Sequence, residues 1–186
     1  MTFKRFFPIV FFLCFSIITF AQKFNGGYLI GFTTSQINGD GIGGFYKYGP
    51  TAGFFVNRDF SNKIDGIFEI RYTGKGSGDG IGNFKINLGY VELPFLLRYN
   101  TSYKLGLKIG IAPAVKVFER TIDAYQYKAH SNDFSIVELP LHMGLDYPLT
   151  KKLNFDLRYS YSSISAGQRR RYTNMCLYFT LHRNFN

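Results

Sequence analysis

The chain has 186 residues, with 21 phenylalanines, 14 tyrosines, 20 glycines and a formal net charge of +10. This length suits one domain, and the abundance of aromatic residues and glycine is typical of strands joined by turns. Of the two cysteines, Cys14 lies in an apolar leader, so Cys176 has no partner for a disulfide or a thiolate metal cluster, and the scattered basic residues argue against nucleic-acid binding.

The first 21 residues have the pattern of a signal peptide. Lys4 and Arg5 precede an apolar run over residues 6–20, and Thr19 and Ala21 place small residues at the positions that a signal peptidase reads. We therefore predict cleavage after Ala21 and one mature domain over residues 22–186. The apolar run is shorter than the ~20 residues of a spanning helix, and an uncleaved anchor is the alternative.

The rest of the chain predicts an all-β fold without a convincing helical period. Eight strands are expected, at residues 26–34, 46–58, 64–76, 84–99, 103–118, 134–147, 152–163 and 172–185. Most are long enough for a tilted strand to cross a bilayer. Apolar positions alternate with polar ones in most of them, while the register of the first two, which are rich in glycine, is ambiguous.

The connections between these strands alternate in length. Long or polar segments (35–45, 77–83, 119–133, 164–171) alternate with short ones (59–63, 100–102, 148–151). Bacterial outer-membrane barrels place short turns in the periplasm and long loops outside. The pattern predicts an eight-stranded antiparallel up-and-down transmembrane barrel in the bacterial outer membrane, with both termini periplasmic.

Residues 137–147 show the two faces of such a strand most clearly. Val137, Leu141 and Leu145 lie on the odd, apolar face, whereas Glu138 and Asp146 lie on the even one. Extending this alternation to the other strands places charges of both signs in the lumen: Glu69, Arg71, Glu92, Arg98, Lys108, Glu138, Asp146, Asp156 and Arg158. Buried charges must be paired, and side chains can fill an eight-stranded lumen. We expect an internal ion-pair network and no open pore.

Two short sequence repeats predict local features of the backbone. Val91-Glu-Leu-Pro94 recurs as Val137-Glu-Leu-Pro140, and each proline predicts a bulge, a bend or a strand end. The segment 39–45 (GDGIGGF) recurs as 78–84 (GDGIGNF) in predicted loops. Turn chemistry explains these glycines and aspartates. The alternative is a weak cation site with Asp40 and Asp79 as oxygen donors, although calcium prefers six to eight oxygens.

Candidate chemical groups are few. His130-Ser-Asn-Asp133 holds the residue types of acyl transfer, but neighbours in sequence rarely form a triad, so we interpret it as a solvated loop. His142 and His182 fall on predicted inner faces and are expected to be hydrogen-bonded rather than metal ligands. Arg169-Arg-Arg171 is either a solvated run or a contact with lipopolysaccharide phosphates, which the arginine fork suits. No cofactor or metal is expected.

Several segments resemble a known family. The Ala21-Gln22 junction, Ser35-Gln-Ile-Asn-Gly-Asp40, Glu69-Ile-Arg-Tyr-Thr-Gly-Lys-Gly-Ser77 and Tyr90-Val-Glu-Leu-Pro-Phe-Leu-Leu-Arg-Tyr99 resemble the PorT-like outer-membrane β-barrel family of Bacteroidota. The resemblance covers essentially the whole mature chain. It implies a small outer-membrane barrel, in some members associated with gliding and type IX secretion, and it carries no catalytic motif. Phe185 fits a barrel-assembly signal, although Asn186 is the last residue.

These observations favour a non-enzymatic barrel that supports an envelope process. Its expected partners are outer-membrane lipid, lipopolysaccharide and envelope or secretion proteins. The alternatives are a narrow channel or small-solute transporter, a lipid-modifying barrel enzyme and a soluble ligand-binding barrel.

Overall fold

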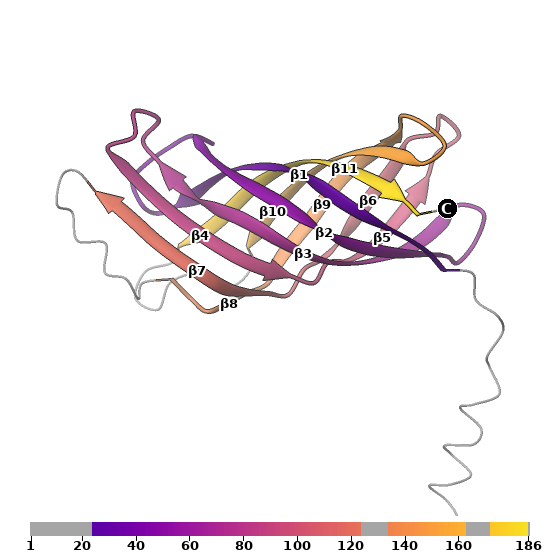
Figure 1. Cartoon of the computed structure of the whole chain (residues 1–186), viewed down its shortest axis with the longest axis horizontal. Helices are drawn as coiled ribbons and strands as arrows, with labels where there is room; N and C mark the ends of the chain where they lie inside the picture. The colour runs from indigo at the N-terminus through magenta and orange to yellow at the C-terminus, as the bar shows by residue number, and fades with distance from the viewer. Residues whose placement is uncertain (1–23, 124–133, 163–171, 186) are drawn as a thin grey trace, which may run out of the picture.

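The structure, a computed structural model, describes residues 24–123, 134–162 and 172–185. They form one antiparallel barrel whose long axis is horizontal in Figure 1. The strands are β1 (Phe24–Asn38), β2 (Lys47–Asp59), β3 (Ile64–Gly78), β4 (Phe84–Glu92), β5 (Phe95–Asn100), β6 (Gly106–Ile111), β7 (Ala114–Asp123), β8 (Val137–Glu138), β9 (Pro140–Pro148), β10 (Leu153–Ser162) and β11 (Thr173–Asn184). The described residues contain no helix that is long and apolar enough to span a membrane.

Eleven strand segments make eight barrel strands, because three of the eight are interrupted. β4 continues as β5, β6 as β7, and β8 as β9. β1 pairs with both β2 and β11, which closes the sheet, and β3 pairs with β5 near its start and with β4 near its end. The predicted eight-stranded antiparallel barrel is confirmed. A closed barrel pairs its strands without leaving a sheet edge, which a membrane requires.

The three interruptions correct the predicted strands 84–99, 103–118 and 134–147, which are not continuous. Pro94, Pro113 and Pro140 cause the breaks, since proline has no amide hydrogen for the ladder. Their carbonyl groups still accept bonds across the gap, from the amides of Glu69 (3.0 Å), Leu93 (2.8 Å) and Ala112 (2.9 Å) respectively. The breaks therefore lie on neighbouring strands, and the wall bends there without losing these bonds.

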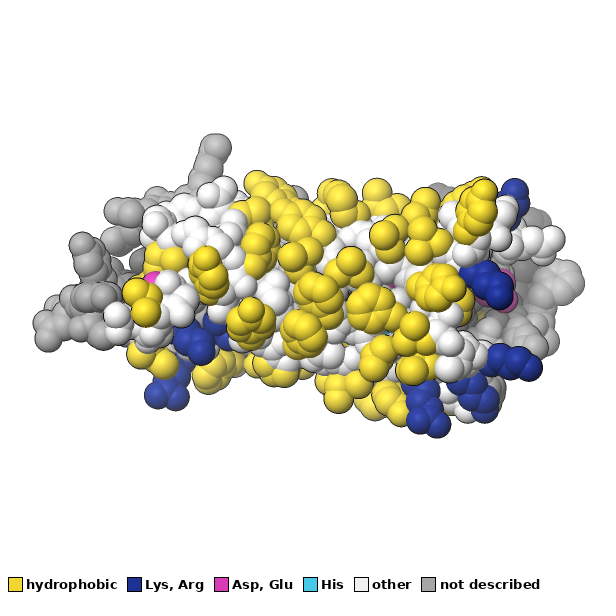
Figure 2. Space-filling view, turned by 90° about the horizontal axis from the view of Figure 1, so that it is seen from above, with side chains coloured by type: hydrophobic (Ala, Val, Ile, Leu, Met, Phe, Trp, Pro, Cys, Tyr) yellow, Lys and Arg dark blue, Asp and Glu magenta, His cyan; other side chains and the backbone are white. Residues whose placement is uncertain are grey.

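The outer wall is apolar, as the alternation predicts. Exposed side chains on it include Ile30, Phe32, Phe54, Phe68, Ile70, Leu97, Ile109, Leu141, Met143 and Leu145. Figure 2 shows hydrophobic side chains over most of the barrel wall. Strand alternation alone fails at one point. A bulge opposite Gly89 and Tyr90 inserts Val117, so Val117 and Phe118 both face outward and the pattern shifts by one residue beyond them.

The first two strands, whose register the sequence left open, have a defined inner face. Leu29, Thr33, Ser35 and Ile37 of β1 are buried, as are Lys47, Thr51 and Phe55 of β2. Strand β1 also runs four residues past the predicted end at residue 34, which shortens the connection to β2. The Thr33 hydroxyl donates to the carbonyl of Gly74 on β3 (2.5 Å), over Gly49 of β2, the strand that lies between β1 and β3. Inward-facing side chains of β1 and β2 thus occupy part of the lumen.

Candidate functional site

The lumen holds a continuous chain of charged side chains with alternating sign. Six carboxylates and five cations follow one another from the end of the barrel near the C-terminus toward the opposite end. The contacts in order are Asp65–Arg98 (3.4 Å), Arg98–Asp146 (2.7 Å), Asp146–Lys108 (3.7 Å), Lys108–Asp156 (2.5 Å), Asp156–Arg158 (2.7 Å), Arg158–Glu69 (2.8 Å), Glu69–Arg71 (3.3 Å), Arg71–Glu92 (2.8 Å), Glu92–Lys75 (2.6 Å) and Lys75–Glu138 (3.6 Å). We call this set the lumenal charge chain.

Glu69 is the central link of the lumenal charge chain. On one side of it lie three carboxylates and three cations, and on the other side two of each, so each half is neutral by itself. Arg158 holds both oxygens of Glu69 with its two terminal nitrogens, at 2.8 and 3.1 Å. Such a fork is a strong form of ion pair. Glu69 therefore has a guanidinium group on each side, from Arg158 and Arg71.

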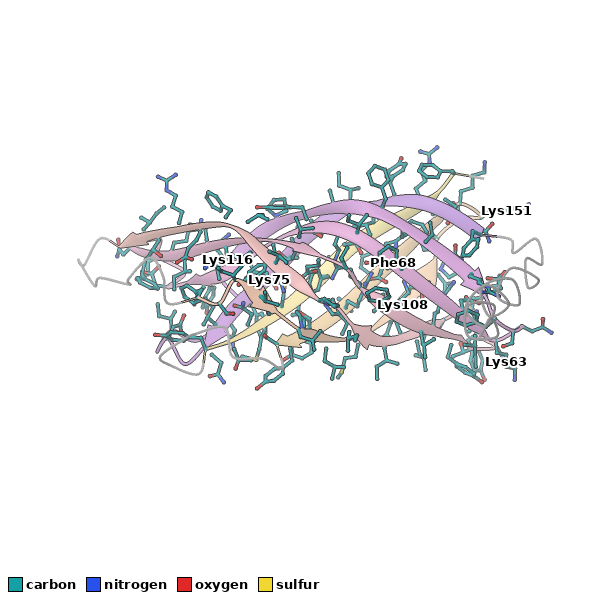
Figure 3. The ribbon with its side chains drawn as sticks, turned by 90° about the horizontal axis from the view of Figure 1, so that it is seen from below. Lys63, Phe68, Lys75, Lys108, Lys116 and Lys151 are labelled. Carbon is teal, nitrogen blue, oxygen red and sulfur yellow. The ribbon has the colours of Figure 1, made fainter. Side chains whose placement is uncertain are left out.

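The middle of the lumenal charge chain is completely buried. The side chains of Glu69, Arg71, Glu92 and Arg158 have an exposed fraction of 0%. A pore wide enough for water would leave some of this surface accessible. Figure 3 labels Lys75 and Lys108, which lie inside the barrel at two levels along its axis. The lumen is thus filled by side chains over the length that these residues occupy.

All nine charged residues that the sequence assigned to the lumen belong to the lumenal charge chain. Two further members were not predicted from the sequence. Lys75 and Asp65 lie in or beside the glycine-rich parts of β3, where alternation is hard to follow. The omission of Lys75 also misassigned a partner. The candidate partners of Glu138 among the nine were Arg71, Arg98, Lys108 and Arg158. Glu138 instead pairs with Lys75, and Asn174 donates a bond to it at 3.2 Å.

Inward-facing glycines make room for the large charged side chains. A Cβ atom at Gly106 would lie 2.1 Å from Asp146 Oδ1 and 2.5 Å from Arg98 Nε. At Gly144 it would lie 2.5 Å from Cγ of Arg158. All three distances are shorter than any normal contact, so the lumenal charge chain can pack as it does only with glycine at these two positions. This accounts for glycine at these inner-face positions of β6 and β9.

Neutral polar groups complete the packing around the charges. The Tyr178 hydroxyl donates to Glu92 (3.1 Å), and the Tyr178 ring lies under the Arg71 guanidinium at 4.3 Å. His142 Nδ1 lies 3.5 Å from Arg71, and His182 Nε2 lies 3.1 Å from the Thr180 hydroxyl and 3.4 Å from Arg158. Both histidines are buried, as expected for lumenal residues.

Apolar clusters line the remaining lumen. Leu29, Phe55, Ile67 and Leu96 pack together in the half of the barrel near the C-terminus. Ile37, Ile86, Leu88, Tyr90, Ala114 and Phe134 form a second cluster in the half near the long connections. The charges thus occupy only part of the cross-section, and the charge chain lies in a low-dielectric environment in which each ion depends on its partners.

The two Gly-Asp-Gly loops lie near each other, and their aspartates cap turns. Asp40 accepts a bond from the amide of Ile42 (2.8 Å), and Asp79 accepts bonds from Gly82 (2.7 Å) and Phe84 (3.2 Å). Burial raises the pKa of Asp40, although the bond from Ile42 opposes this. Among the residues that the structure describes, no three His, Cys, Asp or Glu side chains are placed to hold a metal ion.

Lys104 lies in a turn, and two segments that the sequence singled out lie outside the described residues. Lys104, which falls within the predicted strand 103–118, is exposed in a turn with φ of 63°, because β6 begins only at Gly106. The Arg169–Arg171 run lies outside the described residues. The same holds for residues 130–133 with their His, Ser and Asp.

The sequence matches a family defined by this architecture. The family model of the outer membrane protein beta-barrel domain matches residues 7–185. The chain belongs to this family. It is an outer-membrane β-barrel protein, and its exposed apolar wall is the lipid-facing surface of a bacterial outer-membrane protein. A search of curated proteins found no matching sequence.

Solved structures with the same fold include two small barrels. Ail, the attachment invasion locus protein of Yersinia pestis, in a phospholipid bilayer nanodisc, is 15% identical, with a TM-score of 0.53 over 88% of this chain and 100% of Ail. Neisserial surface protein A is 10% identical, with a TM-score of 0.52 over 87% of this chain and 97% of that protein. At this identity the likeness shows the fold alone.

Proposed function

We propose that this protein is a non-enzymatic outer-membrane barrel with a closed lumen, which supports an envelope process through its loops and turns. In this proposal residues 1–21 are a signal peptide, removed after Ala21. The observation that carries the proposal is the complete burial of Glu69, Arg71, Glu92 and Arg158 in the lumenal charge chain. Those side chains occupy the path that a solute would need, so the surfaces left for function lie at the two ends.

Planar-bilayer recording of the refolded protein tests the closed lumen. We expect no conductance steps from the wild type. Replacing Arg71 and Arg158 by serine removes the two largest fully buried side chains and should create a water-wide gap with measurable conductance. Regular conductance steps from the wild type would refute the closed lumen and favour the narrow channel or small-solute transporter, the second candidate.

The same proposal places both termini in the periplasm. The connections 60–63, 101–105 and 149–152 are short and lie at the end that carries the C-terminus, as Figure 1 shows. Short turns are periplasmic in bacterial outer-membrane barrels. An epitope inserted at the exposed Gly82 should bind antibody on intact cells, whereas one after Asn186 should bind only after permeabilisation. The reverse result would invert the orientation.

For the envelope process itself, the resemblance around Tyr90–Tyr99 supports membership of the PorT-like group of Bacteroidota and a link to secretion. Cross-linking in intact cells, followed by identification of the cross-linked proteins, tests this link. A lipid-modifying enzyme is the third candidate. It is less well supported because His142 and His182 are both buried in the lumen, away from lipid substrates. A turnover assay on lipid extracts would detect such an activity.

The outer rim is proposed to contact lipopolysaccharide through Arg169, Arg170 and Arg171. Arginine forks match phosphate oxygens. One structural relative, Ail, has been crystallised in complex with the heparin analogue sucrose octasulfate, with a TM-score of 0.53 and 14% identity over 88% of this chain and 99% of Ail. The triple alanine variant should lose retention on immobilised lipopolysaccharide. Retention equal to that of the wild type would remove this proposal.

A further inference from the structure

The three short turns share one sequence feature. Each has a lysine at or next to its end, directly followed by an aliphatic residue: Lys63 before Ile64, Lys104 before Leu105 and Lys152 before Leu153. All three lysines are exposed. We call them the lysine collar. In the sequence, Lys23 likewise precedes Phe24, where β1 begins, so a lysine lies within two residues of the start of every barrel strand that starts at this end.

The turns do not need these ammonium groups for their own structure. In the first turn the Ser61 hydroxyl accepts the amides of Lys63 (3.3 Å) and Ile64 (3.1 Å). In the third turn the Thr150 hydroxyl accepts the amides of Lys152 (3.3 Å) and Leu153 (3.1 Å) in the same way. Backbone groups and hydroxyls therefore close both turns.

The backbone holds the lysines in fixed places while their side chains remain unpaired. The carbonyl of Lys63 accepts a bond from the amide of Asn100 (2.8 Å), and that of Lys152 accepts one from Asn184 (2.9 Å). No carboxylate in the described ranges lies within ion-pair distance of a collar lysine. Figure 3 labels Lys63 at the same end of the barrel as Lys151. The collar thus presents free positive charge at a defined level.

An exposed apolar side chain accompanies the lysine in every turn. Phe60 is 56% exposed, Tyr103 88% and Leu149 52%. The Arg58 guanidinium also lies over the Phe60 ring at 5.4 Å. An apolar side chain beside a long cationic one is the pattern of a membrane interface, where the first enters the boundary of the acyl chains and the second reaches the phosphate level.

We propose that the lysine collar binds the phosphate groups of anionic phospholipids in the leaflet at this end of the barrel. Exposed Lys151 and Arg183 add to the positive charge, and Asp59 is an exposed acid in the same region. Figure 2 shows Lys and Arg side chains at this end, directly next to the apolar wall, and a smaller group at the opposite end. A leaflet fits better than an acidic protein, because the lysines are distributed one or two to a turn around the rim instead of concentrated on one side.

This lipid site is separate from the proposed closed lumen and does not depend on it. It also does not depend on which leaflet the turns contact. The test is lipid selectivity of the full barrel. Protein folded in vesicles of equal parts phosphatidylglycerol and phosphatidylcholine is released gently, and the retained lipids are counted by native mass spectrometry. We expect the wild type to retain phosphatidylglycerol in excess, with an excess that shrinks at high salt.

The decisive variant is K63Q/K152Q, since Lys104 adopts a positive φ and is best left unchanged. A basic residue near an anionic membrane surface contributes roughly a fivefold preference, so the phosphatidylglycerol excess should fall severalfold. The matched control is K85Q/R120Q, which removes two exposed cations from β4 and β7 at the opposite end. A heat-modifiability gel confirms that each variant is folded.

The outcomes separate clearly. Loss of the excess in K63Q/K152Q but not in K85Q/R120Q supports the lipid site. No excess in the wild type, or equal loss in both variants, overturns it. If the excess is absent and an acidic protein co-purifies from cells with the wild type but not with K63Q/K152Q, the collar is a protein-binding surface and the lipid proposal is wrong.

Discussion

The sharpest consequence of the lumenal charge chain concerns Glu69, which joins its two neutral halves. Arg158 contacts both carboxylate oxygens at 2.8 and 3.1 Å, and Arg71 approaches one of them at 3.3 Å. Glu69→Gln keeps the shape of the side chain but removes its charge. The two guanidinium groups would then face each other across a neutral amide in a site that water does not reach.

The expected loss in the free energy of unfolding depends on the ion pairs that each arginine keeps in the variant. Breaking a buried ion pair by removing one partner costs about 3–5 kcal/mol. After Glu69→Gln, Arg71 still pairs with Glu92 at 2.8 Å and Arg158 with Asp156 at 2.7 Å. We therefore expect the lower end, about 3 kcal/mol. Arg158→Met instead leaves six carboxylates against four cations, so we expect the upper end, about 5 kcal/mol.

A double-mutant cycle distinguishes this network from ordinary packing. In Glu69→Gln/Arg158→Met neither partner of the central pair is left without its counterpart, so the cost should fall below the sum of the single variants by about 0.5–3 kcal/mol. The assay is urea unfolding of the barrel in phospholipid vesicles, followed by the heat-modifiable gel shift. Ser160→Ala, which removes a buried hydroxyl that donates to Tyr178 at 3.3 Å, is the lumenal control at about 1 kcal/mol.

Either of two results would contradict the coupling between Glu69 and Arg158. One is an Arg158→Met barrel that unfolds at the same urea concentration as Ser160→Ala. The other is strict additivity of the two single substitutions, which would mean that Glu69 and Arg158 do not depend on each other.

Three further substitutions test the wall, the glycines and the end of the charge chain. Leu141→Arg puts a cation on the lipid face, where it costs about 2–4 kcal/mol at mid-bilayer, and should reduce the folded fraction on a heat-modifiability gel, whereas Leu149→Arg in a turn should not. Gly106→Ala should cost about 1–3 kcal/mol by overpacking, measured by urea unfolding; Gly43→Ala, with open space around it, should match the wild type. Glu138→Lys puts two ammonium groups together and should lower the urea midpoint; an unchanged midpoint would argue against pairing at this position.

Part of the architecture could be read from the chain because a strand has a period of two. In the stretch around Leu141 and Asp146, alternation is enough to say that one face meets lipid and the other the lumen, whatever the partner strands are. The prolines at 94 and 140 also signalled irregular strands, since each removes a ladder bond. The bulge at Val117 had no such signal, because two successive outward apolar residues are compatible with either register.

For the lumenal charge chain, the sequence predicted most of the residues that face the lumen but not all of the pairs that they form. Nine charged residues could be assigned to the interior from their strand positions, whereas Lys75 was hidden among glycines of β3. Its absence left Glu138 with the wrong expected partners. Those glycines carry no side chain to mark a face, so the pattern that located Glu69 and Arg71 gives no information a few residues later.

The amino-acid sequence by itself determined that this protein is a membrane barrel with an apolar wall and a charged interior, because both properties depend only on alternation along each strand. The tertiary structure alone decided which charges meet, that Glu69 links two neutral halves, and that the lysines of three separate turns form one collar. Those facts depend on the stagger between strands and on barrel closure, which bring together residues far apart in the chain.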